Sequence, residues 1–149
     1  MNGEERALEM EMRIDAPPET VFAFFTDPEL YRRWKGVRAE LDARPGGTYR
    51  VDMGPNGWIA GEYVAVEPPN RVVFTWGWED DPHVPPGTTH VEVTFVRDGE
   101  ATLVRLRHSG FAADAARDQH AAGWQHLLSR LAIVGTGGDP GPDPLMKSS

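Results

Sequence analysis

Hydrophobic and polar residues alternate with a period of two through most of residues 37–108. This alternation is typical of antiparallel strands that bury one face against a core. Turn-forming glycines and prolines separate the segments, and Asp98-Gly99 gives the sharpest signal for a tight hairpin. Together with an apolar opening segment, the pattern predicts strands at about residues 8–14, 37–43, 48–53, 58–66, 72–78, 91–95 and 102–108.

Apolar residues with helical spacing occur in two regions. After the first strand, Pro17 and Pro18 stand where a helix begins, and Pro28 begins a second one with Thr26 or Asp27 as its N-cap. Nearer the C-terminus, a long helix is predicted from Asp114, as its cap, to about residue 134, with Gly135 at its C′ position. Its apolar stripe consists of Trp124, Leu127, Leu128, Leu131 and Val134.

The order of these pieces resembles the START-like (SRPBCC, helix-grip) superfamily, and within it the AHSA-type family, the activator of heat-shock-protein ATPase homologue-like proteins. The resemblance covers roughly residues 8–134. The resemblance rests on six segments that occur in the same order as in the family, namely residues 15–34, 44–47, 61–64, 67–76, 108–111 and 123–131. It implies an α+β helix-grip fold, in which a curved antiparallel sheet wraps around the long C-terminal helix and two short helices follow the first strand. Residues 135–149 are rich in glycine and proline, and we expect them to form a flexible tail.

The resemblance further implies a ligand cavity between the sheet and the C-terminal helix. Residues on the inward faces are candidates for its wall, because aromatic side chains give rigid, large contact areas. For each of them the alternative is ordinary core packing. The candidates are Met53, Phe74, Trp76, Val93, Phe95, His108, His120 and Trp124.

Other residues are candidates for the entrance of this cavity or for its packing. Trp34 and Trp58 are expected to cover the mouth, and Trp78 begins a long loop, residues 79–87, that is a candidate lid. Glu62 is a further polar candidate if its face of the strand points inward. Gly123, beside Trp124, is expected to let a strand approach the helix closely.

His108 and His120 are the polar residues with the greatest chemical interest. Both lie on predicted inward faces. One interpretation is that they orient a polar group of a ligand or transfer a proton to it. The alternative is that each is a partly buried histidine with its hydrogen bonds satisfied inside the protein. We expect at most one of them to open onto the cavity, because no other acid or base converges there.

Composition removes several classes of function. The chain has 149 residues, no cysteine and a net charge of −8, which argues against disulfides, cysteine-based zinc sites and nucleic-acid partners. The basic cluster at residues 32–35 is expected to coat an exposed helix face. No metal site, cofactor motif, nucleophile elbow, membrane span or signal peptide is evident, so we expect a cytoplasmic protein. The oligomeric state stays open.

Three hypotheses for function remain. The first is a binding protein for a small apolar or amphipathic molecule. The second is an enzyme of the cyclase/aromatase kind found in the same superfamily, with His108 and His120 as acid and base. The third is a chaperone-linked interaction module, which the family name suggests.

Overall fold

The computed structural model describes residues 6–141, and within them seven strands form one antiparallel sheet in the order β1-β7-β6-β5-β4-β3-β2. The strands are β1 (Arg6–Ile14), β2 (Arg38–Leu41), β3 (Thr48–Asp52), β4 (Trp58–Glu67), β5 (Arg71–Trp76), β6 (Thr89–Asp98) and β7 (Ala101–Phe111). The Asp98-Gly99 hairpin is confirmed, since Asp98 pairs with Ala101 across the turn between β6 and β7. The chain therefore has the antiparallel sheet that its hydrophobic pattern predicts.

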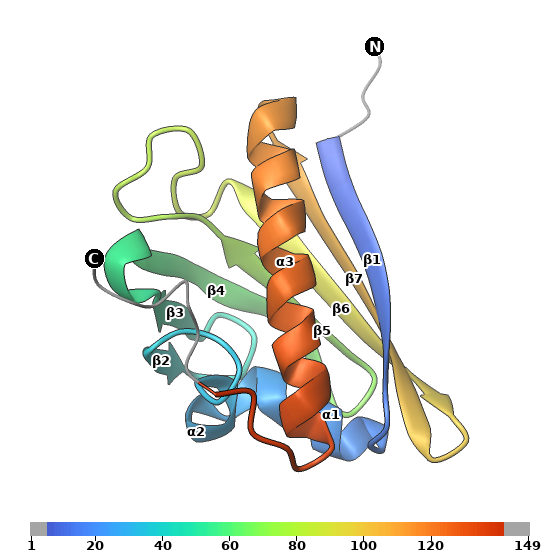
Figure 1. The fold of residues 1–149 in the computed structure, drawn as a ribbon. Coiled ribbons are helices and arrows are strands. Elements are labelled where there is room, and N and C mark those ends of the chain that lie inside the picture. Colours follow the sequence, from blue (N-terminus) through green and yellow to red (C-terminus); the bar gives the residue numbers. More distant parts are fainter. Residues whose placement is uncertain (1–5, 142–149) are drawn as a thin grey trace.

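The helices lie on one side of this sheet. Figure 1 shows α3 (Asp114–Gly135) crossing the sheet obliquely, while α1 (Pro18–Thr26) and α2 (Pro28–Tyr31) close its lower end. A short 3₁₀ helix, η1 (Gly54–Asn56), follows β3. The α+β helix-grip architecture is thus confirmed. The last helix ends at Gly135, one residue beyond its predicted end.

Local capping explains where the short helices break. The Asp27 side chain accepts hydrogen bonds from the backbone N–H groups of Glu29 (2.9 Å) and Leu30 (3.4 Å). Two of the N–H groups that have no partner within α2 are therefore satisfied, and Pro28 occupies its first turn. Asp27, rather than Thr26, is the cap.

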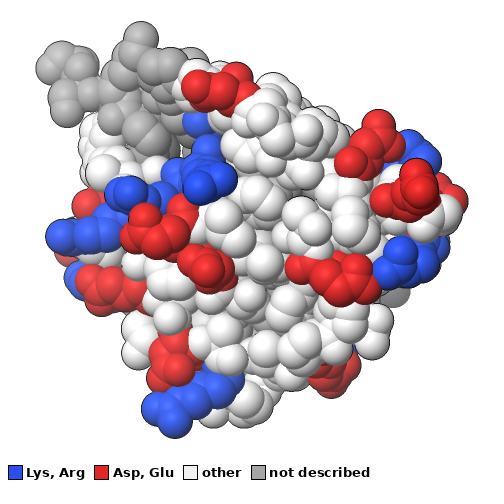
Figure 2. Space-filling model, turned by 90° about the horizontal axis from the view of Figure 1, so that it is seen from below, with Lys and Arg blue, Asp and Glu red and all other residues white. Residues whose placement is uncertain are grey.

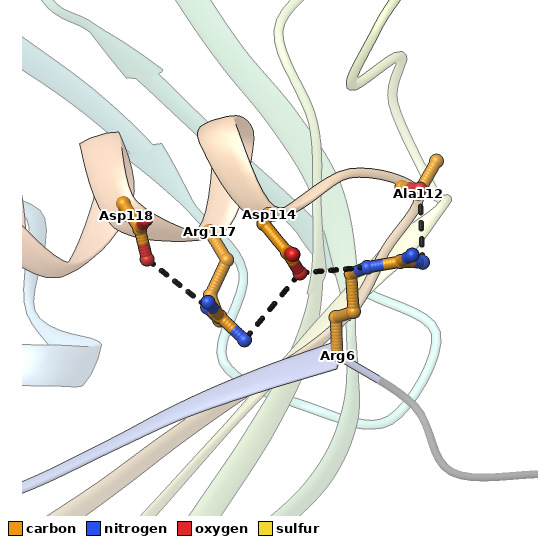
Figure 3. Close-up of polar contacts among 5 residues, drawn as sticks. All are labelled: Arg6, Ala112, Asp114, Arg117 and Asp118. Carbon is orange, nitrogen blue, oxygen red and sulfur yellow. Dashed lines mark hydrogen bonds and ion pairs between the residues drawn. The ribbon is translucent and has the colours of Figure 1, made fainter.

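The N-terminus of α3 departs from the prediction. Ala113 is the N-cap and Asp114 is the first helical residue, so the cap assignment to Asp114 is wrong. The Asp114 carboxylate instead accepts from Arg6 Nε of β1 at 2.8 Å, and Arg6 Nη1 donates to the Ala112 carbonyl at 3.0 Å (Figure 3). Arg117 also contacts Asp114, at 3.6 Å. These contacts connect the beginning of α3 to the edge strand β1.

The C-terminal end of α3 departs from the prediction as well. Gly135 is the last helical residue, Thr136 is the C-cap, and Gly137 has the positive φ of 89° that ends the helix. A Cβ on Gly135 would lie 2.8 Å from Cγ2 of Ile14, so Gly135 allows the helix to approach β1. The first residues of the expected tail contact α3, because Arg130 Nη2 donates a hydrogen bond to the Gly141 carbonyl at 2.9 Å. Residues 142–149 of the expected tail lie outside the described residues.

The core lies between the sheet and α3. Val91, Val93 and Phe95 of β6 are buried on one face, as the alternation predicts. Glu62 is exposed, so its strand face points outward and it is not a cavity residue. No helix within residues 6–141 is long and apolar enough to cross a membrane. On the face shown in Figure 2, acidic and basic side chains are interspersed around a centre that carries neither, and they form no continuous basic patch.

Candidate functional site

A cavity of about 380 Å³ lies between the sheet and α3. This volume falls within the range of small-molecule sites. Its wall combines the β3–β4 connection, the strands β4 and β5, the loop after β5 and the first half of α3. The lining residues are Met53, Asn56, Gly57, Trp58, Ile59, Trp76, Trp78, Asp80, Asp81, Gln119, His120, Gly123, Trp124 and Leu127.

Tryptophan side chains form much of this wall. Trp76 of β5 and Trp124 of α3 are nearly fully buried, with ring centres 5.2 Å apart. Trp78 packs edge-on against Trp76 at 6.3 Å. Tryptophan side chains have few rotatable bonds, so they give the cavity a large and rigid apolar surface. The Trp76 Nε1 atom is buried without a hydrogen-bond partner among the described residues.

Gly123 creates part of the open volume. No atom lies within 4 Å of the place where its Cβ would stand, and the residue lines the cavity. The expectation that Gly123 lets a strand approach closely is therefore wrong. A missing side chain on the inner face of α3 leaves space instead of allowing contact.

The loop after β5 is fastened to the body of the protein. The Trp78 N–H donates to the Val84 carbonyl at 2.7 Å, and the Glu79 N–H donates to the Trp58 carbonyl at 2.9 Å. Val84 is buried. A Cβ on Gly77 would lie 2.0 Å from the Pro85 carbonyl oxygen, so only glycine lets the loop fold back this closely. The loop therefore forms a fixed side of the cavity.

His108 is a fully engaged core residue. Trp124 Nε1 donates to His108 Nδ1 at 3.0 Å, so Nε2 carries the proton and donates to Thr89 Oγ1 at 2.8 Å. Thr89 in turn donates to the Trp76 carbonyl at 2.8 Å. Burial lowers the pKa of His108 well below its usual value, and the neighbouring His120 adds to this effect. His108 does not line the cavity.

His120 lines the cavity but is also engaged at both nitrogens. Trp78 Nε1 donates to His120 Nε2 at 2.9 Å, and His120 Nδ1 donates to the Ala116 carbonyl at 2.7 Å. Burial lowers the pKa of His120, although the Ala116 bond and the charge of Asp81 act in the opposite direction. Of the two histidines only His120 lines the cavity, as expected, but the ground for that expectation is wrong, because Asp80 and Asp81 also line it.

Lys35 is buried in the interior, so the prediction that it coats an exposed helix face is wrong. Its Nζ lies 3.9 Å from the ring centre of Trp76 and 4.1 Å from that of Trp124, and it donates to the Tyr49 hydroxyl at 3.3 Å. The Tyr49 hydroxyl also bonds to the Tyr31 hydroxyl. Burial lowers the pKa of Lys35 well below its usual value. The amine therefore lies directly behind two rings of the cavity wall.

The sequence also places this chain among known proteins. Residues 15–135 match the family described as activator of Hsp90 ATPase homolog 1-like protein. The chain belongs to the AHSA1-like family. A solution structure of the AHSA1-like protein of Rhizobium etli is 39% identical, with a TM-score of 0.76, and the match covers 98% of this chain and 91% of that one.

Two further relatives extend the comparison. CalU16 of Micromonospora echinospora is 28% identical, with a TM-score of 0.77 over 97% of this chain and 81% of that one. An uncharacterized protein of Schizosaccharomyces pombe is 30% identical over 95 residues, which span 63% of this AHSA1-like chain and 26% of the yeast protein. The match thus spans about a quarter of the yeast relative's length.

The predicted site residues of this AHSA1-like chain divide into two groups. Met53, Trp76, His120 and Trp124 line the cavity, whereas Phe74, Val93, Phe95 and His108 are buried outside its lining. Phe95 does not reach open space because Phe22 and Phe25 of α1 pack against it at 5.4 and 5.3 Å. Of the two tryptophans expected at the mouth, Trp58 lines the cavity and Trp34 is buried, with its Nε1 donating to the Phe24 carbonyl at 2.9 Å.

Sequence reasoning missed two features, one in the lining of the AHSA1-like cavity and one behind its wall. Asp80 and Asp81 both line the cavity, although their segment has no hydrophobic periodicity that would indicate where their side chains lie. Lys35 follows a short helix and begins no periodic segment, so nothing in the hydrophobic pattern indicated its direction. The available signal was the pair of large aromatic residues beside it, Tyr31 and Trp34. Both are buried, so this turn faces the core.

Proposed function

We propose that this AHSA1-like protein binds a small apolar or amphipathic molecule in the cavity between the sheet and α3, and that it holds this molecule without transforming it. The observation that carries the proposal is the cavity of about 380 Å³ with tryptophans from both the sheet and the helix in its wall. Large apolar surfaces with a few polar groups at the edge are the usual composition of such sites.

The histidine geometry supports binding over acid–base chemistry by this pair. A general acid or base needs a nitrogen within hydrogen-bond reach of the substrate. Both nitrogens of His120 and both of His108 already have partners within the protein. The cyclase-like alternative would require these bonds to break before a substrate proton moves.

Two substitutions at one position test the proposal. Gly123→Leu should place a side chain in the open volume, whereas Gly123→Ala should leave most of it free. We expect the wild type and Gly123→Ala to take up the neutral fluorescent probe Nile red, and Gly123→Leu to bind it at least about tenfold more weakly. Fluorescence titration measures the affinity.

The fold is checked in the same samples. Far-UV circular dichroism and thermal unfolding should be unchanged or improved in both variants, since alanine and leucine are better helix formers than glycine. If the wild type takes up no apolar probe, or if Gly123→Leu binds it as well as the wild type does, the proposed cavity function is wrong.

A further inference from the structure

Every charged side chain that lines the cavity is acidic within the described residues. These are Asp80 and Asp81, on the loop that forms one side of the cavity. The third titratable group, His120, accepts a hydrogen bond at Nε2, and burial lowers its pKa, so it adds no positive charge near neutral pH. Two carboxylates beside an apolar volume give the cavity a negative potential.

Four tryptophans line the same cavity: Trp58, Trp76, Trp78 and Trp124. The face of an indole ring attracts cations, and rings gathered around one volume are the usual recognition element for quaternary ammonium groups. Trp58 already shows this property within the protein, because the Arg50 guanidinium lies 3.9 Å from its ring centre.

The basic side chains that contact the tryptophans of the cavity lie outside its lining. Arg50 is paired with Glu79 at 2.7 Å, and Arg38 lies 5.2 Å from the Trp58 ring; neither lines the cavity. Lys35 lies behind the rings of Trp76 and Trp124 and outside the lining. Burial lowers the pKa of Lys35, which weakens any repulsion of a cation on the cavity side of those rings.

The chemistry of the wall distinguishes an organic cation from a metal ion. Hard metal cations require several converging oxygen ligands. Within the described residues, no group of three His, Asp or Glu side chains is placed to hold a metal ion. Aromatic rings with carboxylates at one side instead suit a charge that is spread over methyl groups and carries an apolar body.

We propose that the cavity selects a small organic cation, an alkylated ammonium group attached to an apolar body, with the ammonium among the indoles and beside Asp80 and Asp81. This inference rests on the proposed function and specifies its ligand class. The indole wall attracts both the charge and the apolar body, and the two carboxylates favour the cation over a neutral molecule of the same shape.

Three probes of one shape and different charge test this selectivity. They are para-hydroxyphenyltrimethylammonium, its neutral carbon isostere para-tert-butylphenol, and the anion para-hydroxybenzenesulfonate. Competition against Nile red gives each affinity. We expect the cation to bind about tenfold more tightly than the neutral isostere, and the anion to bind most weakly.

A pair of charge variants locates the source of the preference. Asp80→Asn combined with Asp81→Asn should reduce the preference for the cation over its isostere several-fold, while para-tert-butylphenol binds as before. Glu62→Gln combined with Glu100→Gln removes the same net charge from two exposed positions outside the cavity lining, and should preserve the preference.

Each outcome decides between the two proposals. Equal or tighter binding of the neutral isostere, with Nile red still displaced in the wild type, would overturn the cation inference and leave the cavity function standing. An equal loss of preference in both charge-variant pairs would also overturn it, because the effect would then come from net charge alone. If neither Nile red nor any of the three probes binds, both proposals fail together.

Discussion

At the scale of single residues, Lys35 is the least expected feature. A lysine amine that is 1% exposed has lost nearly all contact with water, and its contacts are two indole rings and one hydroxyl rather than a carboxylate. Transfer of a charged amine into such an environment is costly, and the group responds by giving up its proton more readily. This is the physical reason for the lowered pKa of Lys35.

Substitution of Lys35 by methionine keeps an unbranched side chain of nearly the same length and removes the ionisable group. Between the lowered folded pKa and the usual value of 10.5, the unfolded chain holds a proton that the folded protein lacks, so wild-type stability rises with pH by up to about 1.4 kcal/mol per unit. Lys35→Met lacks this contribution. We expect its stability advantage to be largest near neutral pH and to shrink toward pH 10, as measured by urea unfolding. Parallel curves for the two proteins would contradict this expectation.

At the scale of elements, α3 makes two different uses of glycine. Gly135 lies at the end of the helix against Ile14, where a Cβ would approach Cγ2 to 2.8 Å. Gly123 faces the cavity, where a Cβ would meet nothing within 4 Å. The first position controls how closely the helix docks on β1, and the second controls how much space remains beneath it.

The same substitution should therefore have opposite effects at these two positions. Gly123→Ala should stabilise the protein by about 1 kcal/mol, because alanine is the better helix former and has free space there. Gly135→Ala should destabilise it, because the β-branched Ile14 is buried and cannot swing aside. Chemical denaturation of both variants measures the two changes. Stabilisation of equal size in both would show that helix propensity, and not docking on β1, determines the outcome.

At the scale of the whole molecule, the neutral histidines connect the sheet to α3. Trp124 of the helix donates to His108 of β7, and His108 donates onward to Thr89 of β6. Protonation of His108 would break the first of these bonds, since its Nδ1 would then carry a proton. The arrangement therefore requires that His108 stay neutral in the folded state, which agrees with its lowered pKa.

Acidification should for this reason destabilise the fold. Below about pH 6.5 the unfolded chain takes up protons at His108 and His120 that the folded protein does not, so stability falls as pH falls, by up to about 1.4 kcal/mol per unit for each histidine. Urea unfolding at a series of pH values measures the slope. NMR of the folded protein should show the His108 ring still neutral when the pH is well below 6.5. A His108 resonance that titrates near 6.5 in the folded state would contradict this prediction.

The sequence by itself determined the elements and their inward faces. The period of two placed Val91, Val93 and Phe95 on the buried side of β6, and the capping chemistry of Asp27 located the break between the two short helices. These features depend on local forces, namely backbone hydrogen bonding, turn geometry and the removal of apolar side chains from water. Such forces act between neighbours in the chain, so a single sequence is enough to predict them.

Only the tertiary structure decided where the cavity lies. Phe74 and Trp76 are neighbours on the same face of β5, yet Phe74 stacks on Tyr49 in the closed core and Trp76 borders open space. A cavity is the volume that remains after helix and sheet have packed, and its position depends on which distant side chains fill the interior. Lys35 fills part of that interior from an irregular turn, and Asp81 reaches the cavity through a loop held at Val84. Both placements follow from contacts between residues far apart in the sequence, which periodicity does not encode.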